Sequence, residues 1–496
     1  MSLRKPSLIA ASALGTLWCT ISLTACLGVH GRQVESDVSL KQAEAEEAKS
    51  VEEQPFQESL TPGATTGSGQ LFVTTERRFQ TLEGFGASVA WYQNLITGPT
   101  AEGLYDFLFP ELGLDILRFR NRFERSTKTD ETTYEEVEIF QRATEALGRP
   151  PRLLLTSWSP PASLKASGKE KCRGEQDCTL KREDGAFVYA KFADWWRRSI
   201  SSYRSLGLDP EFVSMQNEPD FIPHDWEGCK FEPAETPEFP GYGKALELVH
   251  AEIQKLPNPP KMLGPETLGI HYHRVPNYLS HIDQSLLHGV AHHIYERGND
   301  NIWDWRFPGP DSYVDEMLIT AAATSKPLYQ TEFQTDEDKG IDGGFETAWL
   351  IHHSLSEEGV VAFLYWDLVW NGKQGLVSIN GGVPTPRDQY YAMRHYSRFT
   401  DPGDVRVGAA GDQKDLLASA YLSPDEKRLT IVALNVSLSA TDVTLNVDGF
   451  PTTNSAVYRT SYRPGHSRRW EELGSLGPDR ELRMPARAVA TIVLER

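Results

Sequence analysis

Two short segments each place a glutamate where an apolar, strand-like run ends. The run 211–216 leads into Asn217-Glu218-Pro219, and the run 327–331 leads into Glu332. Two carboxyl groups that face each other can hydrolyse a glycosidic bond, because one donates a proton to the leaving oxygen while the other attacks the sugar or activates water. The alternatives are that Glu218 caps the following helix and that Glu332 is an ordinary loop carboxylate.

The elements around these segments alternate between short apolar strands and amphipathic helices, with Pro or Gly at the joins. Helices are expected over 187–206, 243–255 and 388–398. The expected strands are 81–88, 116–121, 152–158, 211–218, 261–267, 289–295, 327–333 and 360–368. Eight such units over 81–400 predict an α/β fold of the (β/α)₈ TIM-barrel type. A Gly-rich phosphate loop follows none of these strands, which disfavours nucleotide binding.

In a (β/α)₈ barrel the reactive groups lie at the C-terminal ends of the strands. A positive charge beside Glu332 would keep it ionised, and repulsion from Glu332 in a less polar setting would raise the pKa of Glu218. Asn217 is positioned to bind a sugar 2-hydroxyl. Other polar or aromatic residues at predicted strand ends include Arg118, Trp158, His293, Tyr295, Trp366 and Asp367.

Beyond residue 400 the apolar residues repeat with period two, which predicts antiparallel strands. Residues 401–496 are therefore expected to form a C-terminal antiparallel β-sandwich side domain, joined by a strand at 70–80. Its expected role is to stabilise the barrel, with ligand binding as the alternative.

The N-terminus has the form of an export signal. Arg4 and Lys5 precede an apolar run too short to span a bilayer, and Leu23-Thr24-Ala25-Cys26 resembles a bacterial lipobox. We expect residues 1–25 to be a lipoprotein signal peptide and Cys26 to be lipidated, which would anchor the protein at the outer membrane or cell surface. Ordinary secretion is the alternative. Residues 26–69 are acidic and poor in large apolar groups, and predict a flexible linker.

Charge and composition narrow the range of partners. The formal net charge of −19 disfavours nucleic acid, and the 12 Trp and 18 Tyr offer flat surfaces that suit sugar rings. The expected partner is a polysaccharide or oligosaccharide, bound by a monomer whose only membrane contact is the lipid anchor.

Export makes disulfides possible among the cysteines that remain after the signal. A Cys172–Cys178 bridge across one loop is the leading pairing, and Cys229 is an alternative partner for either. We expect no metal site, since His does not occur at ligand spacing near these cysteines.

Taken together, several motifs resemble glycoside hydrolase family 30 over roughly residues 70–496. They are EGFGAS, LLLTSWSPPASLKASG, SMQNEPDF, AHHIY, YQTEF and YWDL. The resemblance implies a retaining mechanism without a cofactor, with Glu218 as acid/base and Glu332 as nucleophile. It also implies that Asn217 holds the sugar, that Trp158 and Trp366 line the cleavage subsite, and that Tyr295 lies near the nucleophile. Arg118, His293 and Trp91 complete the substrate-binding candidates.

The motifs constrain the substrate less than they constrain the fold and the catalytic pair. Asp220-Phe221 and the WSPPASLKASG stretch look closer to the xylanase branch of the family, which favours an endo-β-1,4-xylanase acting on plant xylan. Bacterial glucuronoxylanases carry an arginine after strand 8, where the loop 369–384 offers Lys373 instead. The alternatives are a glucosylceramidase-like enzyme, an endo-β-1,6-glucanase, or an inactive carbohydrate-binding lipoprotein.

Two further groups of residues remain candidates for binding. Trp226, Trp303 and Trp305 occur in long loops and either form stacking subsites along a polymer or pack the loops themselves. His271 and His273 have metal-like spacing, but loop packing or hydroxyl recognition is the expected role.

Overall fold

The computed structural model describes residues 68–125, 129–174, 177–295, 311–335, 340–462 and 468–496. The predicted signal peptide, Cys26 and most of the predicted linker lie outside these ranges, as do Trp303 and Trp305. Among the described residues, no helix is both long and apolar enough to cross a membrane.

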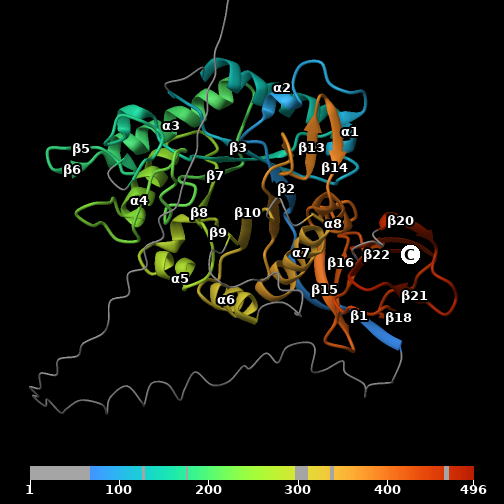
Figure 1. The fold of residues 1–496 in the computed structure, drawn as a ribbon. Coiled ribbons are helices and arrows are strands. Elements are labelled where there is room, and N and C mark those ends of the chain that lie inside the picture. Colours follow the sequence, from blue (N-terminus) through green and yellow to red (C-terminus); the bar gives the residue numbers. More distant parts are fainter. Residues whose placement is uncertain (1–67, 126–128, 175–176, 296–310, 336–339, 463–467) are drawn as a thin grey trace, which may run out of the picture. The chain divides into compact units, whose positions relative to one another are not determined.

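Eight parallel strands close into a barrel in the order β10-β11-β2-β3-β4-β7-β8-β9 (Figure 1). The predicted (β/α)₈ barrel is therefore confirmed. The barrel strands are β2 (Gly84–Ser88), β3 (Ile116–Arg120), β4 (Arg152–Thr156), β7 (Phe212–Ser214), β8 (Lys261–Thr267), β9 (Gly289–His293), β10 (Leu328–Glu332) and β11 (Ala362–Tyr365).

Helices follow the strands and cover the outside of the barrel. They are α1 (Leu104–Leu108), α2 (Thr129–Leu147), α3 (Tyr189–Ser205), α4 (Tyr242–Ile253), α5 (Arg274–Leu279), α6 (Asp311–Ala322), α7 (Gly340–His353) and α8 (Asp388–Ser397). Helix α7 continues into a π-helical turn, Ser354–Glu358, and single 3-10 turns occur at Gln93–Leu95, Ala162–Leu164 and Gln284–Leu286. Short strands decorate the loops: β5 (Arg182–Glu183), β6 (Ala186–Phe187), β12 (Val369–Trp370), β13 (Val377–Asn380) and β14 (Val383–Pro386).

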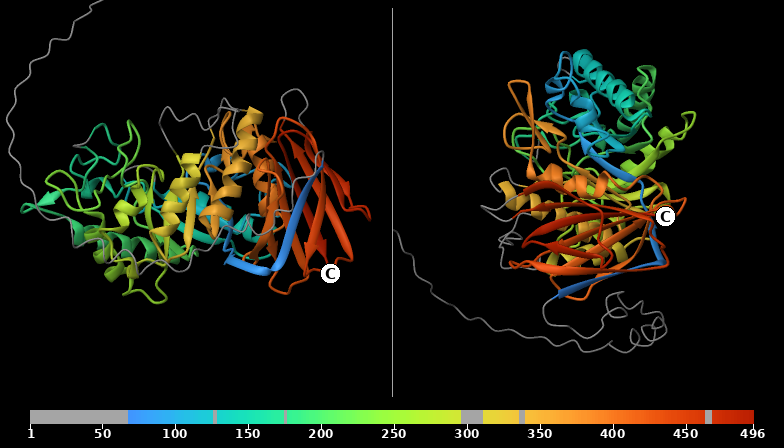
Figure 2. Two further views of the ribbon diagram at one scale, coloured as in Figure 1. Left: turned by 90° about the horizontal axis from the view of Figure 1, so that it is seen from below. Right: turned by 90° about the vertical axis from the view of Figure 1, so that its right-hand side faces the viewer.

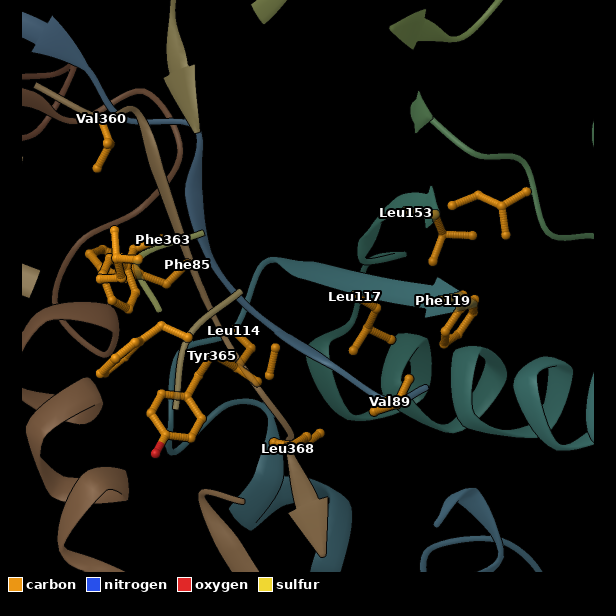
Figure 3. Close-up of a cluster of buried hydrophobic side chains, with 14 of the residues drawn as sticks. Phe85, Val89, Leu114, Leu117, Phe119, Leu153, Val360, Phe363, Tyr365 and Leu368 are labelled. Atoms are coloured by element: carbon orange, nitrogen blue, oxygen red, sulfur yellow. The ribbon is translucent and has the colours of Figure 1, made fainter. Parts of the chain in front are cut away.

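Alternation along the strands separates two apolar layers. On β4, Leu153 and Leu155 pack in the core between strands and helices, whereas Leu154 packs in the barrel interior. Figure 3 shows part of the strand–helix core, including Phe85, Leu117 and Phe363. Because side chains alternate with period two, a polar residue two positions after an interior residue also faces the interior.

The second domain is one nine-stranded sheet, in the order β20-β19-β22-β17-β16-β15-β1-β18-β21. In Figure 2 its strands lie together, with β1 in blue among strands coloured orange to red. All its pairings are antiparallel except the parallel one between β1 and β18. Its strands are β1 (Ser68–Thr81), β15 (Val405–Gly411), β16 (Leu416–Leu422), β17 (Arg428–Asn435), β18 (Thr441–Asp448), β19 (Asn454–Ser461), β20 (Arg468–Gly474), β21 (Glu481–Met484) and β22 (Ala488–Glu495). The sheet has a core of its own, which includes Leu71, Ile431 and Ile492.

A buried histidine joins the barrel to this sheet. His395 of α8 lies 2.8 Å through Nδ1 from Thr491 Oγ1 on β22 and 2.8 Å through Nε2 from Thr460 Oγ1 on β19. Burial lowers the pKa of His395 to about 3. The folded protein therefore holds this imidazole neutral at pH values where the unfolded chain protonates it.

We predict that the free energy of unfolding falls as the pH decreases from about 6.5 towards 3, because protons bind the unfolded state preferentially. The contribution of His395 approaches roughly 1.4 kcal/mol per pH unit within this window. Thermal unfolding of His395→Gln should show a flatter pH dependence than the wild type, whereas His224→Gln, at a side chain that is 84% exposed, should not. Equal slopes for His395→Gln and the wild type would contradict the prediction.

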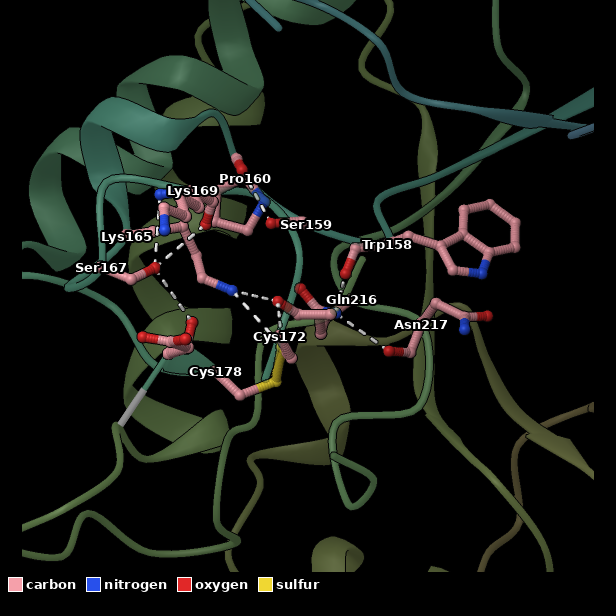
Figure 4. The surroundings of a disulfide bond; sticks show 12 residues. Trp158, Ser159, Pro160, Lys165, Ser167, Lys169, Cys172, Cys178, Gln216 and Asn217 are labelled. Atoms are coloured by element: carbon pink, nitrogen blue, oxygen red, sulfur yellow. Dashed lines mark hydrogen bonds between the residues drawn. A yellow bond between two sulfur atoms is a disulfide. The ribbon is translucent and has the colours of Figure 1, made fainter. Parts of the chain in front are cut away.

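A disulfide joins Cys172 and Cys178 (Figure 4). Cys229 is a buried free thiol. The bridged loop is tied to the neighbouring loop by hydrogen bonds from Cys172 N to Trp226 O (2.8 Å) and from Asp225 N to Cys172 O (3.0 Å). Closing such a short loop stabilises a fold by about 2 kcal/mol. We expect Cys172→Ser/Cys178→Ser to lower the unfolding free energy by about that amount in chemical denaturation, and Cys229→Ser to serve as the comparison with the bridge intact.

Candidate active site

Arg118 is the centre of the candidate site, and strand alternation brings it there. Ile116 of β3 packs in the barrel interior, so Arg118, two residues later, faces the same way and is fully buried. Its Nη1 lies 2.5 Å from Glu332 Oε2 and its Nη2 lies 2.5 Å from Asn217 Oδ1. A third contact runs from Nη2 to Glu266 Oε1 at 3.1 Å. Arg118 thus fixes three side chains that are far apart in the sequence.

Glu332 reaches the interior through a register shift. Tyr329 of β10 faces the barrel interior, so simple alternation would direct Glu332 to the opposite face. The pairing of β10 with β9 shifts between Gln330 and Glu332, and such a shift re-aims the side chain that follows it. As a result Glu332 is 6% exposed and paired with Arg118.

Glu218 lies beyond the strand that was predicted to carry it, because β7 ends at Ser214. The residues after β7 still form backbone hydrogen bonds to the segments on either side. Asn217 N donates to Ser157 O, after β4 (2.8 Å), and Glu218 N donates to Glu266 O, in β8 (3.0 Å). Glu218 itself has a left-handed backbone (φ 46°), a costly conformation for a residue other than glycine that is found preferentially at functional sites.

His293 connects the carboxylates. It follows the interior residue Ala291 on β9 by two positions, and it is fully buried. Its Nδ1 lies 3.1 Å from Glu218 Oε1, and its Nε2 lies 3.8 Å from Glu266 Oε1 and 4.0 Å from Glu332 Oε2. His293 is one of the predicted substrate-binding residues, and its contacts in the structure are to these acidic groups.

The two catalytic candidates differ in their electrostatic surroundings. Burial raises the pKa of Glu218 to about 7, with a further rise from the negative charge of Glu332 and an opposing effect of the His293 hydrogen bond. Burial also disfavours protonated His293, but the neighbouring carboxylates outweigh it and raise its pKa to about 9. Glu218 is therefore suited to donate a proton, whereas Glu332 is ion-paired with Arg118.

Aromatic side chains form one wall beside these groups. Trp158 and Trp366 are almost fully buried, and the Trp91 ring lies 5.3 Å and 5.0 Å from them between ring centroids. Arg118 lies over the Trp158 ring at 4.4 Å. In Figure 4, Trp158 and Asn217 lie side by side, and Gln216 holds both through hydrogen bonds from Nε2 to their backbone oxygens at 2.8 and 2.9 Å.

Tyr295 belongs to the same site. Its ring centroid is 6.0 Å from that of His293, and burial together with the charges of Glu332 and Glu218 raises the pKa of its hydroxyl well above the usual value. All seven substrate-binding candidates therefore gather around the glutamate pair, directly or through a neighbouring ring.

The remaining candidates do not come together as a second site. His271 is buried against Tyr313, whereas His273 is largely exposed and lies 3.2 Å from Glu316 Oε2. Trp226 is exposed, and the centroid of its ring lies 6.1 Å from that of Phe221. Asp220 is engaged by Leu268 N (2.9 Å) and Arg274 (3.4 Å), so this residue holds two loops together.

One group of His, Cys, Asp and Glu in the described part of the chain has metal-like geometry. Ligand-type atoms of Glu218, His293 and Glu332 lie within 4.8 Å of one another. The guanidinium of Arg118 already binds Glu332 at 2.5 Å, and a second cation at that carboxylate would meet its repulsion. The same 4.8 Å limit brings an oxygen of Glu218 and one of Glu332 close enough to act on opposite sides of a single bond.

One residue of the site was not singled out from the sequence. Glu266, at the end of β8, is fully buried and contacts both Arg118 and His293. It is a carboxylate at the end of a predicted strand, which is the signal that identified Glu218 and Glu332. Asp367, predicted at the end of strand 8, lies after β11 and is also fully buried, and burial raises its pKa well above the usual value.

Comparison with known proteins shows which proteins this chain is similar to. No family model matches the sequence. The chain is 24% identical to the glucuronoxylanase XynC of Bacillus subtilis over 464 residues, covering 88% of this chain and 95% of that protein. It is 23% identical to the lysosomal acid glucosylceramidase of Mus musculus, covering 79% and 83%. The solved structure of the glycoside hydrolase family 30 subfamily 8 xylanase Xyn30A of Clostridium acetobutylicum superposes with a TM-score of 0.65 at 21% identity, covering 86% of this chain and all of that one.

The resemblance to glycoside hydrolase family 30 is supported by the sequence similarity to two glycosidases and by the shared fold of a solved family 30 xylanase. Both curated relatives are glycosidases, which supports the expectation of an O-glycosyl hydrolase. The shared fold comprises the barrel and the β-domain built on β1 and β15–β22. The motifs AHHIY and YQTEF, on which the resemblance was based, supply His293, Tyr295 and Glu332 of this site.

Proposed function

We propose that this protein is a retaining β-glycosidase in which Glu332 is the nucleophile and Glu218 the acid/base. The observation that carries the proposal is the closeness of the pair, since one oxygen of each lies within 4.8 Å of the other. So close an approach favours retention, because retaining enzymes place the two carboxyl groups roughly 5–5.5 Å apart, whereas inverting enzymes leave roughly 6.5–9.5 Å for a water molecule.

The reaction then has two steps that balance without a cofactor. Glu332 attacks the anomeric carbon while Glu218 donates its proton to the glycosidic oxygen, which leaves as an alcohol. In the second step Glu218, now a carboxylate, takes a proton from water as the water oxygen attacks the same carbon and releases Glu332. Asn217, held by Arg118, is placed to bind a hydroxyl next to the reacting carbon.

For the substrate we propose β-1,4-xylan, cleaved internally. The support is the similarity to proteins named as xylanases over most of both chains. The similarity to a glucosylceramidase keeps a β-glucoside as the second candidate, together with a β-1,6-glucan. An inactive binding protein is the weakest candidate, because both carboxylates and their partners are present and paired.

The test measures the activity of the protein on glucuronoxylan, unbranched xylan, β-1,6-glucan and an aryl β-glucoside. The products are separated by chromatography. Xylo-oligosaccharides of mixed length are expected, and activity on glucosides alone would overturn the xylan proposal. Proton NMR of the first product should show the β-anomer before mutarotation, and an α-anomer would overturn retention. Comparison of the two xylans measures the dependence on glucuronate, which we expect to be weak with Lys373 in place of an arginine.

We also propose that the chain is exported and anchored through a lipid on Cys26. The Cys172–Cys178 disulfide supports an oxidising compartment, since such bridges are rare in the cytosol. Mass spectrometry of the membrane fraction should find the diacylglyceryl-modified Cys26 peptide, and Cys26→Ala should move the protein to the soluble fraction.

A further inference from the structure

A third buried carboxylate, Glu266, lies against the catalytic pair without being one of its members. It is fully buried near the end of β8, where the pairing with β9 shifts register between Pro265 and Thr267. Its backbone is left-handed (φ 64°), an unfavourable conformation for glutamate. Such backbone strain in a buried residue is found preferentially where function requires it.

The register shift aims this side chain at the cations of the site. Leu263 of β8 faces the barrel interior, so regular alternation would direct Glu266 away from it. Instead Glu266 Oε1 lies 3.1 Å from Arg118 Nη2 and 3.8 Å from His293 Nε2. Its backbone oxygen accepts the hydrogen bond from Glu218 N at 3.0 Å.

His293 is held between two carboxylates as a consequence. One ring nitrogen faces Glu218 at 3.1 Å and the other faces Glu266 at 3.8 Å. A histidine with an acidic partner at each nitrogen is stabilised as the imidazolium. Burial raises the pKa of Glu266, but Arg118 and His293 outweigh it and hold the pKa below the usual value, so Glu266 stays ionised.

The charges of the cluster can then be counted. Arg118 and His293 contribute two positive charges and Glu266 one negative charge, which leaves room for one further negative charge. In the free enzyme that charge is on Glu332, and Glu218 is protonated. In the covalent intermediate Glu332 is a neutral ester, and the balance is restored when Glu218 loses its proton.

We propose that Glu266 is a positioning residue that keeps His293 protonated, so that Glu218 and Glu332 together hold one negative charge throughout the reaction. The proposal rests on the proposed double displacement. It gives a physical reason for Glu218 to act first as an acid and then as a base, because an uncompensated charge in a buried site is costly and neighbouring buried groups titrate together. The other titratable or charged groups near this cluster are Asp220, Tyr242, Arg274, Tyr295 and Asp367.

Glu266→Gln keeps the shape of the side chain and removes its charge. Removing a negative charge disfavours protonation of both His293 and Glu218, so their pKa values should fall. The basic limb of the pH profile of kcat/KM should move to lower pH by about one to three units, the size of effect that a charge at this distance exerts. Glu266→Asp retains the charge and should largely restore the wild-type profile.

Glu358 provides a matched control. It is a buried carboxylate that pairs with His292 Nε2 at 2.5 Å, and His292 neighbours His293 on the opposite face of β9. Glu358→Gln therefore makes the same chemical change at a buried histidine outside the site. We expect it to leave the pH profile unchanged, whatever its effect on the thermal unfolding temperature.

The decisive measurement is the titration of His293 by nitrogen-15 NMR of the full-length protein, with the signal identified by its loss in His293→Gln. In the wild type this imidazole should remain protonated at neutral pH and titrate near pH 9. In Glu266→Gln the midpoint should fall by at least one unit, while Glu358→Gln leaves it in place. A wild-type midpoint at or below 6.5, or an unchanged midpoint in Glu266→Gln, would overturn the proposal.

These experiments distinguish a failure of the Glu266 proposal from a failure of the proposed function. The NMR titration needs no substrate, so it tests Glu266 even if no glycoside is turned over, which would instead overturn the proposed function. If Glu266→Gln does not fold, the wild-type midpoint and the Glu266→Asp titration decide the question. An activity loss in Glu266→Gln with an unshifted pH profile would indicate a purely structural role and would also overturn the proposal.

Discussion

Glu332→Gln is expected to lower kcat/KM by about 10⁴-fold or more on every glycoside that the wild type cleaves, a loss of the size seen when a covalent nucleophile is removed. The amide cannot form the glycosyl ester, and the second step then has no intermediate to hydrolyse. The measurement is initial rates on an aryl β-glycoside with an activated leaving group, where assistance by Glu218 matters least. In Glu332→Ala, where truncation of the side chain leaves space, added azide should restore part of the turnover by attacking the anomeric carbon from the vacated side.

Folding has to be checked in the same variant, because Glu332 is buried and not a free rim carboxylate. It is 6% exposed and pairs with Arg118, and removing one partner of a buried ion pair is destabilising by about 3–5 kcal/mol when the other charge is left alone. Arg118 keeps Glu266 at 3.1 Å, so we expect a smaller loss.

The matched control is Glu211→Gln, the same substitution at the opposite, N-terminal end of the barrel. Glu211 pairs there with Arg152 and Lys261, where side chains serve stability. This variant should keep its activity, and its thermal unfolding temperature is compared with that of Glu332→Gln. Near-wild-type turnover in a folded Glu332→Gln protein would contradict the assignment of the nucleophile.

Glu218→Gln is expected to separate substrates by their leaving group. Cleavage of xylan needs a proton on the departing oxygen, so kcat/KM should fall by about 10²–10⁴-fold, the usual contribution of a general acid. A dinitrophenyl glycoside leaves without that proton, and its first step should be nearly preserved while the intermediate accumulates. A burst of phenol followed by slow turnover is the expected time course.

The pH profile gives an independent measure of the same residue. Because burial and the charge of Glu332 raise the pKa of Glu218 to about 7, wild-type kcat/KM on xylan should decline as the pH rises through about 7. The rate falls and does not rise at high pH because Glu218, as the general acid, must be protonated to donate. This basic limb should be absent in Glu218→Gln. An equal loss on both substrates with the limb retained would show that another group is the acid.

The predicted and observed ranges agree best for the barrel strands. All eight barrel strands lie within or at the predicted ranges, because short apolar runs bounded by Gly, Pro and polar residues are local features. The end of β7 is the largest difference. The predicted strand reached Glu218, but β7 stops at Ser214 and the chain continues with hydrogen bonds to Ser157 and Glu266 on its two sides.

Interior positions were predictable only where alternation is regular. Arg118 and His293 follow interior residues by two positions, so their direction is set by the local pattern. Glu332 and Glu266 face the same interior only because β10 and β8 each shift register against β9. A register shift depends on pairing with another strand, and no single segment of sequence specifies it.

The sequence by itself determined the fold class, the order of the strands and the two glutamates with the chemistry to act on a glycosidic bond, because these depend on local periodicity and residue type. The tertiary structure decided how the electrostatic surroundings of these two glutamates differ. That difference comes from Arg118, Glu266 and His293, which are separated from the pair by up to 214 residues along the chain yet lie within about 4 Å of it or of one another. A pKa responds to charge and burial across space, and only folding brings those charges together.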